Sequence, residues 1–99
     1  AAPGQMSSHY APATPLRMDA ARRDDAVHIG FGAHAGDLTL SATGDMREAA
    51  AALFDVLHRA DAMARARGLR RIDVAPVPET GLGRAINDRL RRAASPRQA

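Results

Sequence analysis

Two glycines in the second half of the chain stand where a phosphate could bind. Gly81 and Gly83 lie between a predicted strand and a predicted helix, where backbone N–H groups and the helix dipole can hold an anion. A dinucleotide fingerprint needs a third Gly or Ala at the position of Ile86, and a phosphate loop needs a lysine, which the chain lacks. The alternative is that both glycines serve a tight turn and close packing, and the residues favour this alternative.

The arginines of the final helix are candidate contacts for an anion or for RNA, together with the two glycines. They are Arg84, Arg91 and Arg92. Residues 59–99 carry ten arginines against four acids, whereas residues 1–58 carry four against seven, so the second half favours an anionic partner. The chain has only three aromatic residues, which argues against a base-stacking platform. A solvated helix face is therefore the alternative interpretation.

One carboxylate falls on the apolar side of a predicted helix. Asp61 follows Leu57 by four residues, and a buried carboxylate needs hydrogen-bond partners. We expect an arginine of the final helix, Arg89, to supply them. The expected role of this pair is structural rather than catalytic.

The composition excludes several kinds of chemistry. No cysteine is present, so disulfides, thiolate metal sites and thiol nucleophiles are ruled out, and without lysine no Schiff base can form. The four histidines (His9, His28, His34 and His58) make no helical i, i+4 pair, so no metal site is predicted. No cofactor is expected in this chain. No apolar run approaches the roughly 18 residues of a membrane helix, and a cytoplasmic location without a membrane partner is expected.

The elements that position these residues alternate between strands and helices. Strands are predicted at 26–32, 37–42 and 69–76, with a short first strand opening at 15–18. The connection between 26–32 and 37–42 is too short for a crossover helix, so this pair is predicted to be antiparallel. Helices are predicted at 44–68 and at about 81–94.

Sequence signals mark the ends and faces of both helices. Asp45 and Glu48 form a predicted capping box, and Gly68 suits the position after the last turn. The predicted inward face of the first helix comprises Met46, Ala50, Leu53, Phe54, Leu57 and Ala64. That of the second comprises Leu82, Ala85, Ile86, Leu90 and Ala93, with Thr80 as its cap.

These elements predict an α/β fold: a small Rossmann-like sheet of three or four strands with two packed helices and a βαβ crossover. Residues 1–15, rich in Pro, Ser and Ala, are predicted to be an extended linker. Residues 16–95 form the predicted folded domain, and 96–99 a frayed tail. We expect residues 1–14 to pack poorly on the domain. The linker nevertheless contains His9 and Tyr10, the only tyrosine of the chain.

Three stretches resemble the two-domain, Sua-type threonylcarbamoyl-AMP synthases. The first looks like the interdomain linker of that family through Pro3, Gly4, Ser8, His9, Tyr10 and Pro12. The second resembles a helix motif of the C-terminal domain through Leu53, Phe54, Leu57 and Asp61. The third looks like the family's C-terminal ending through Gly81, Leu82, Gly83, Ala85, Ile86, Asp88, Arg89, Leu90 and Ala93.

The resemblance implies a function for the whole protein. In this family a YrdC-like catalytic domain, a nucleotidyltransferase, uses ATP with Mg to make threonylcarbamoyl-AMP from threonine and bicarbonate. The product serves threonylcarbamoyladenosine formation in tRNA. The resemblance implies that residues 1–15 are an interdomain linker and 16–95 the accessory C-terminal domain, without catalytic residues. His9 and Tyr10 would then form a latch over the nucleotide site of the YrdC-like domain. An RNA- or tRNA-binding module is the alternative, and tRNA or tRNA-modification proteins are possible further partners.

Overall fold

The structure, a computed structural model, describes residues 13–94. Its elements are β1 (Leu16–Arg17), β2 (Val27–Gly30), β3 (Leu38–Thr39), α2 (Met46–Arg67), β4 (Ile72–Val74) and α3 (Leu82–Ala94). The four strands form one sheet in the order β1-β4-β2-β3, and every neighbouring pair is parallel. The predicted α/β fold with a βαβ crossover is therefore confirmed, with four strands.

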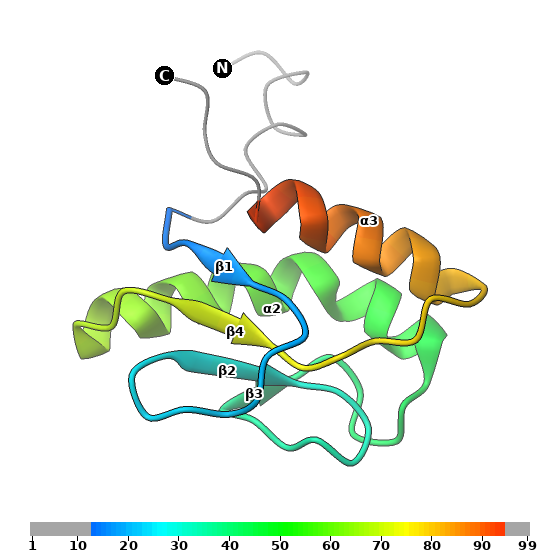
Figure 1. Cartoon of the computed structure of the whole chain (residues 1–99), viewed down its shortest axis with the longest axis horizontal. Coiled ribbons are helices and arrows are strands. Elements are labelled where there is room, and N and C mark those ends of the chain that lie inside the picture. Colours follow the sequence, from blue (N-terminus) through cyan, green and yellow to red (C-terminus); the bar gives the residue numbers. More distant parts are fainter. Residues whose placement is uncertain (1–12, 95–99) are drawn as a thin grey trace.

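The two helices cover the sheet and each other (Figure 1). The crossover helix α2 joins β3 to β4 and packs against β2, β3 and β4. The final helix α3 packs against α2 and against β1, the strand at the end of the sheet. The core between helices and sheet is built from aliphatic side chains such as Ile29, Ile72 and Val74.

The prediction that β2 and β3 are antiparallel is wrong. The chain turns back within the connection, where Phe31 and His34 exchange two backbone hydrogen bonds of 3.0 and 3.1 Å. The N–H of Asp37 then donates to the carbonyl of His28, so β3 starts level with β2 and runs in the same direction. This return requires Gly30, because a Cβ there would overlap the carbonyl oxygen of His34.

Helix α2 begins and ends where the sequence predicted. The Asp45 carboxylate accepts hydrogen bonds from the backbone N–H groups of Arg47 and Glu48, and Gly68 ends the helix at φ 68°. The predicted capping box is modified, because Glu48 does not reach back to the N–H of Asp45. That N–H donates to the Ser41 hydroxyl, which in turn donates to Glu48.

The buried face of α2 is rotated from the predicted one. Ala50 is exposed and Phe54 half-buried, because the helix instead buries Ala49, Leu53, Val56, Leu57, Ala60 and Ala64. The small alanines let α2 approach the sheet closely, which decides the face that packs.

The inward face of α3 is also only partly as predicted. Ile86 and Leu90 are buried, but Ala85 is exposed and Leu82 is 44% exposed. Asn87 is buried instead, and its Nδ2 donates to the carbonyl of Val77 at 2.8 Å, which fastens α3 to the segment after β4. This polar contact was not predicted.

Replacement of Leu57 by alanine tests the packing of α2. Leu57 is only 3% exposed, so Leu57→Ala should lower the free energy of unfolding by about 2–5 kcal/mol, as for other buried leucines. The matched control is Leu82→Ala, the same change at an exposed position, which should alter it by less than about 0.5 kcal/mol. Chemical denaturation measures both, and equal effects would show that the core is misplaced.

Candidate functional site

The junction between the predicted linker and the domain is held by one side chain of α2. Asp61 accepts hydrogen bonds from the backbone N–H groups of Ala13 at 3.2 Å and Thr14 at 3.1 Å, and from the Thr14 hydroxyl at 2.5 Å. The chain stays fastened at the next residue, because the carbonyl of Pro15 accepts a hydrogen bond from the N–H of Ile72. The chain segment before β1 is thus joined to α2 and then to β4.

The expectation that residues 1–14 pack poorly is wrong for Ala13 and Thr14. Thr14 is buried, and both residues are hydrogen-bonded to a helix 47 and 48 positions away in the sequence. The two predicted latch residues, His9 and Tyr10, lie outside the described residues.

Asp61 does not pair with Arg89 as predicted. Its charged neighbour is Arg65, one turn along the same helix at 3.7 Å. The Arg89 guanidinium instead lies 5.1 Å above the centre of the Phe54 ring, a cation–π contact between α3 and α2. Phe54 lies two helical turns from Asp61, so the arginine is held away from the carboxylate.

Hydrogen bonding keeps Asp61 ionised. Burial alone would raise the pKa of its carboxyl group. The Thr14 hydroxyl, the two backbone N–H groups and Arg65 outweigh that effect and hold the pKa below its ordinary value. The Asp61 carboxylate is therefore negatively charged while it accepts these hydrogen bonds.

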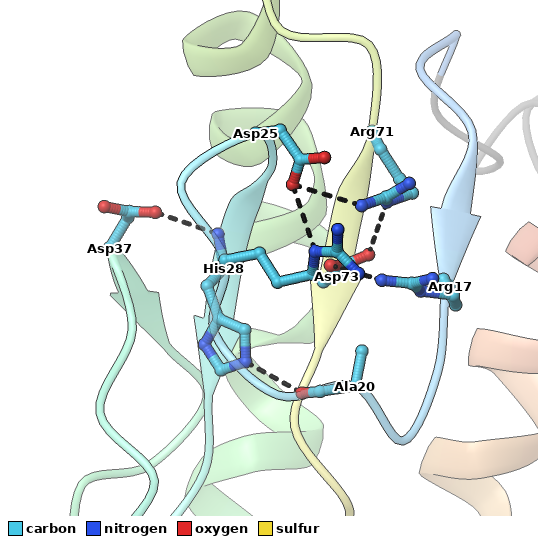
Figure 2. Close-up of polar contacts among 8 residues, drawn as sticks. Arg17, Ala20, Asp25, His28, Asp37, Arg71 and Asp73 are labelled. Atoms are coloured by element: carbon cyan, nitrogen blue, oxygen red, sulfur yellow. Dashed lines mark hydrogen bonds and ion pairs between the residues drawn. The ribbon is translucent and has the colours of Figure 1, made fainter.

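A second polar group of residues lies on the sheet face opposite the core (Figure 2). Asp73, at the centre of β4, is 0% exposed, and its two oxygens accept hydrogen bonds from Arg17 and Arg71, each at 3.0 Å. Arg71 also contacts Asp25 at 3.2 Å, and Arg23 contacts the same carboxylate at 3.3 Å. These alternating charges follow one another across β1, β4 and the loop before β2. Sequence reasoning missed Asp73. A carboxylate between two apolar residues of a predicted strand, here Ile72 and Val74, was the signal that could have indicated a buried charge.

His28 is a buried neighbour of this group. It pairs in register with Asp73, and its Nε2–H donates to the carbonyl of Ala20 at 3.0 Å. Its Nδ1 atom is buried without a hydrogen-bond partner among the described residues, and a Cβ at Gly36 would lie 2.6 Å from it. The ring thus lies closely under the 31–37 connection and has a packing role.

Asp37, just before β3, joins that edge of the sheet to β2 and to the end of α2. Its carboxylate accepts the backbone N–H of His28 at 2.9 Å and contacts Arg22 at 3.0 Å and Arg67 at 3.5 Å. Burial alone would raise its pKa, but these donors lower it below the ordinary value.

Gly81, just before α3, and Gly83, in its first turn, are explained by backbone geometry. Gly81 adopts a left-handed φ of 53°, and a Cβ at Gly83 would overlap the carbonyl oxygen of Pro78. Both observations agree with the turn-and-packing alternative. A contact with an anion stays a prediction.

The candidate arginines of α3 lie beside carboxylates or carbonyls. Arg91 contacts Glu79 at 2.9 Å, Arg92 contacts Asp88 at 3.3 Å, and Nε of Arg84 donates to the carbonyl of Glu79 at 3.5 Å. Their positive charge is partly balanced within the domain.

Within residues 13–94, no group of three His, Cys, Asp or Glu side chains is placed to hold a metal ion. The helices of the same region are too short or too polar to cross a membrane.

The pH dependence of unfolding tests the Asp61 anchor. Because the folded pKa lies below the ordinary 3.8, the anchor stabilises the fold fully above that value. The stabilisation is lost as the pH falls through the folded pKa. The difference in unfolding free energy between the unsubstituted chain and Asp61→Asn should therefore shrink as the pH falls below 3.8 and through the folded pKa.

The matched control is Asp55→Asn, which removes an exposed carboxylate of the same helix paired with Arg59 at 3.7 Å. At each pH, Asp55→Asn should have nearly the same unfolding free energy as the unsubstituted chain. A difference for Asp61→Asn that stays constant over this pH range would contradict the anchor.

Comparison with known proteins identifies the family of the chain. Residues 1–95 match the profile of the family described as threonylcarbamoyl-AMP synthase, C-terminal domain. A search of curated proteins found no match, and a search of solved structures also found none. The matched region includes the predicted linker, the Asp61 anchor and both helices. The chain therefore belongs to the C-terminal domain family of threonylcarbamoyl-AMP synthase.

Proposed function

We propose that this chain is the accessory domain and linker of an L-threonylcarbamoyladenylate synthase. A YrdC-like domain of the same polypeptide would bind ATP with Mg and make threonylcarbamoyl-AMP from threonine, bicarbonate and ATP, releasing pyrophosphate. The product would serve tRNA modification. The linker residues His9 and Tyr10 would close over the nucleotide site of that domain, while the present chain alone would not catalyse the reaction.

The observation that carries the proposal is the hydrogen bonding of Ala13 and Thr14 to Asp61. A latch works only if one end is held, because an unheld segment spends most of its time away from its target. Tyr10 precedes Ala13 by three positions, so the ring can lie at most roughly 10 Å further along the chain. The anchor therefore restricts the volume that the ring can visit.

The size of this effect follows from the length of the tether. Without the Asp61 contacts, the next attachment is Pro15, five residues after Tyr10, whose carbonyl accepts a hydrogen bond from the N–H of Ile72. Lengthening the free chain from about three to about five residues lowers its effective concentration at the target about twofold, by the −3/2 power of length. Asp61 thus acts as a positioning residue, and Tyr10 supplies the covering group that excludes water from a reactive intermediate.

Replacement of Tyr10 tests the latch. In the protein that includes the catalytic domain, Tyr10→Ala should lower the rate of threonylcarbamoyl-AMP formation at least about tenfold, because a bound intermediate would be open to water. Tyr10→Phe keeps the ring and should retain most of the activity. His34→Ala, outside the latch, is the control. An unchanged rate and an unchanged ATP affinity in Tyr10→Ala would sink the proposal.

A double substitution separates positioning from stability. Asp61→Asn alone should lower kcat/KM for ATP about twofold at a temperature where the domain stays folded. In a Tyr10→Ala background the same change should have no further effect, because no ring remains to be positioned. Equal losses in both backgrounds would mean that Asp61 acts only through the fold.

A further inference from the structure

A cleft of about 380 Å³ lies beside the linker junction, at the sheet edge where β1 and β4 begin. It is lined by Pro15, Asp25, Gly68, Leu69, Arg70 and Arg71. Pro15 directly follows Thr14, so the cleft adjoins the Asp61 anchor. Its volume lies in the range of small-ligand sites, roughly 300–1,000 Å³.

The guanidinium groups beside this cleft are held in place by a buried carboxylate. Asp73 binds Arg17 through one oxygen and Arg71 through the other, so the two guanidiniums lie close to each other (Figure 2). Their side chains are still 45% and 30% exposed. A guanidinium has five N–H donors, of which the Asp73 and Asp25 contacts use one in Arg17 and two in Arg71. Donors with a fixed orientation therefore remain for a ligand.

The charge balance of the region is positive. Four arginines lie in or beside the cleft (Arg17, Arg23, Arg70 and Arg71), against the carboxylates of Asp25 and Asp73, so two positive charges remain. Within residues 13–94, Arg70 has no carboxylate within 4 Å, and it is exposed. The cleft also adjoins the C-terminal end of α2, whose negative dipole end the two positive charges must outweigh. The carbonyls of Ala64 and Arg65 near that end already accept the N–H groups of Leu69 and Gly68.

We propose that this cleft binds a phosphate group, with Arg70 and Arg71 as its donors and Arg17 as a flanking cation. Arginine guanidiniums match the geometry of phosphate oxygens through paired N–H groups. The cleft lining contains no aromatic side chain, so a nucleic acid would be held by its backbone and not by its bases. Binding should be independent of sequence and strongly weakened by salt. The proposal does not depend on the latch.

The test uses the whole 99-residue chain and three phosphate probes. The probes are a fluorescent 20-nucleotide RNA, AMP and inorganic phosphate, with RNA binding followed by anisotropy at about 50–200 mM salt. The RNA should bind, and Arg70→Ala should weaken binding about three- to tenfold and reduce the slope of log K against log salt by about 1. Circular dichroism should show an unchanged fold, because Arg70 has no ion pair to lose among the described residues.

The control is Arg47→Ala, which removes another exposed arginine, at the opposite end of α2 from the cleft. The control variant should bind the RNA with nearly the affinity of the unsubstituted chain. Displacement of RNA by AMP or phosphate would assign the cleft to phosphate monoesters, and its failure would assign the cleft to the phosphodiester backbone; both support a phosphate site. The proposal is overturned if none of the probes binds, or if Arg70→Ala and Arg47→Ala weaken binding equally.

Discussion

The carboxylate of Asp73 is fully buried at the centre of the sheet, and much of the surrounding structure is arranged to neutralise it. An unpaired carboxylate at such a position would cost several kcal/mol. Its two arginines come from β1 and from the residue before β4, so the same contact joins the edge strand to a central one. Because Arg17 follows Thr14 by three residues, the placement of β1 also fixes where the preceding chain meets the domain.

Aspartates provide the other attachments of this small domain. The strands contain two to four residues each, so the sheet ladder holds the chain through few hydrogen bonds. Asp37, Asp45 and Asp61 each accept hydrogen bonds from backbone N–H groups of another segment or of a helix end. Charge-assisted hydrogen bonds of this kind are stronger than neutral ones, which suits a fold with a core of modest size.

The two proposed functional features share one region of the molecule. Asp61 binds the chain at the junction, and Arg70 and Arg71 line the cleft. Pro15, which follows Thr14, belongs to the cleft lining as well. A ligand in the cleft would therefore contact the first residue after the anchored pair. The arginine-rich helix α3, which the sequence alone suggested for an anion, carries arginines that already meet carboxylates at Glu79 and Asp88. The proposed cleft at the start of β4 is therefore a second candidate anion site, different from the one that the sequence alone suggested.

Local sequence determined the features that depend on neighbouring residues. Asp45 and Gly68 mark the ends of α2 because capping and left-handed φ are decided within one helical turn. Ile86 and Leu90 follow helical periodicity, and the linker and C-terminal motifs already indicated the family that residues 1–95 match.

Only the tertiary structure decided the features that depend on distant segments. Asp61 meets Thr14 across 47 positions, and Asp73 meets Arg17 across 56. Neither spacing leaves a periodic signal in the sequence, so Arg89 was the plausible but wrong partner of Asp61. The direction of β3 was likewise decided by a reversal within residues 31–37 that brings Asp37 level with His28. In each case a carboxylate or a strand is placed by packing against chain that lies far away in sequence, and periodicity and propensity carry no information about that packing.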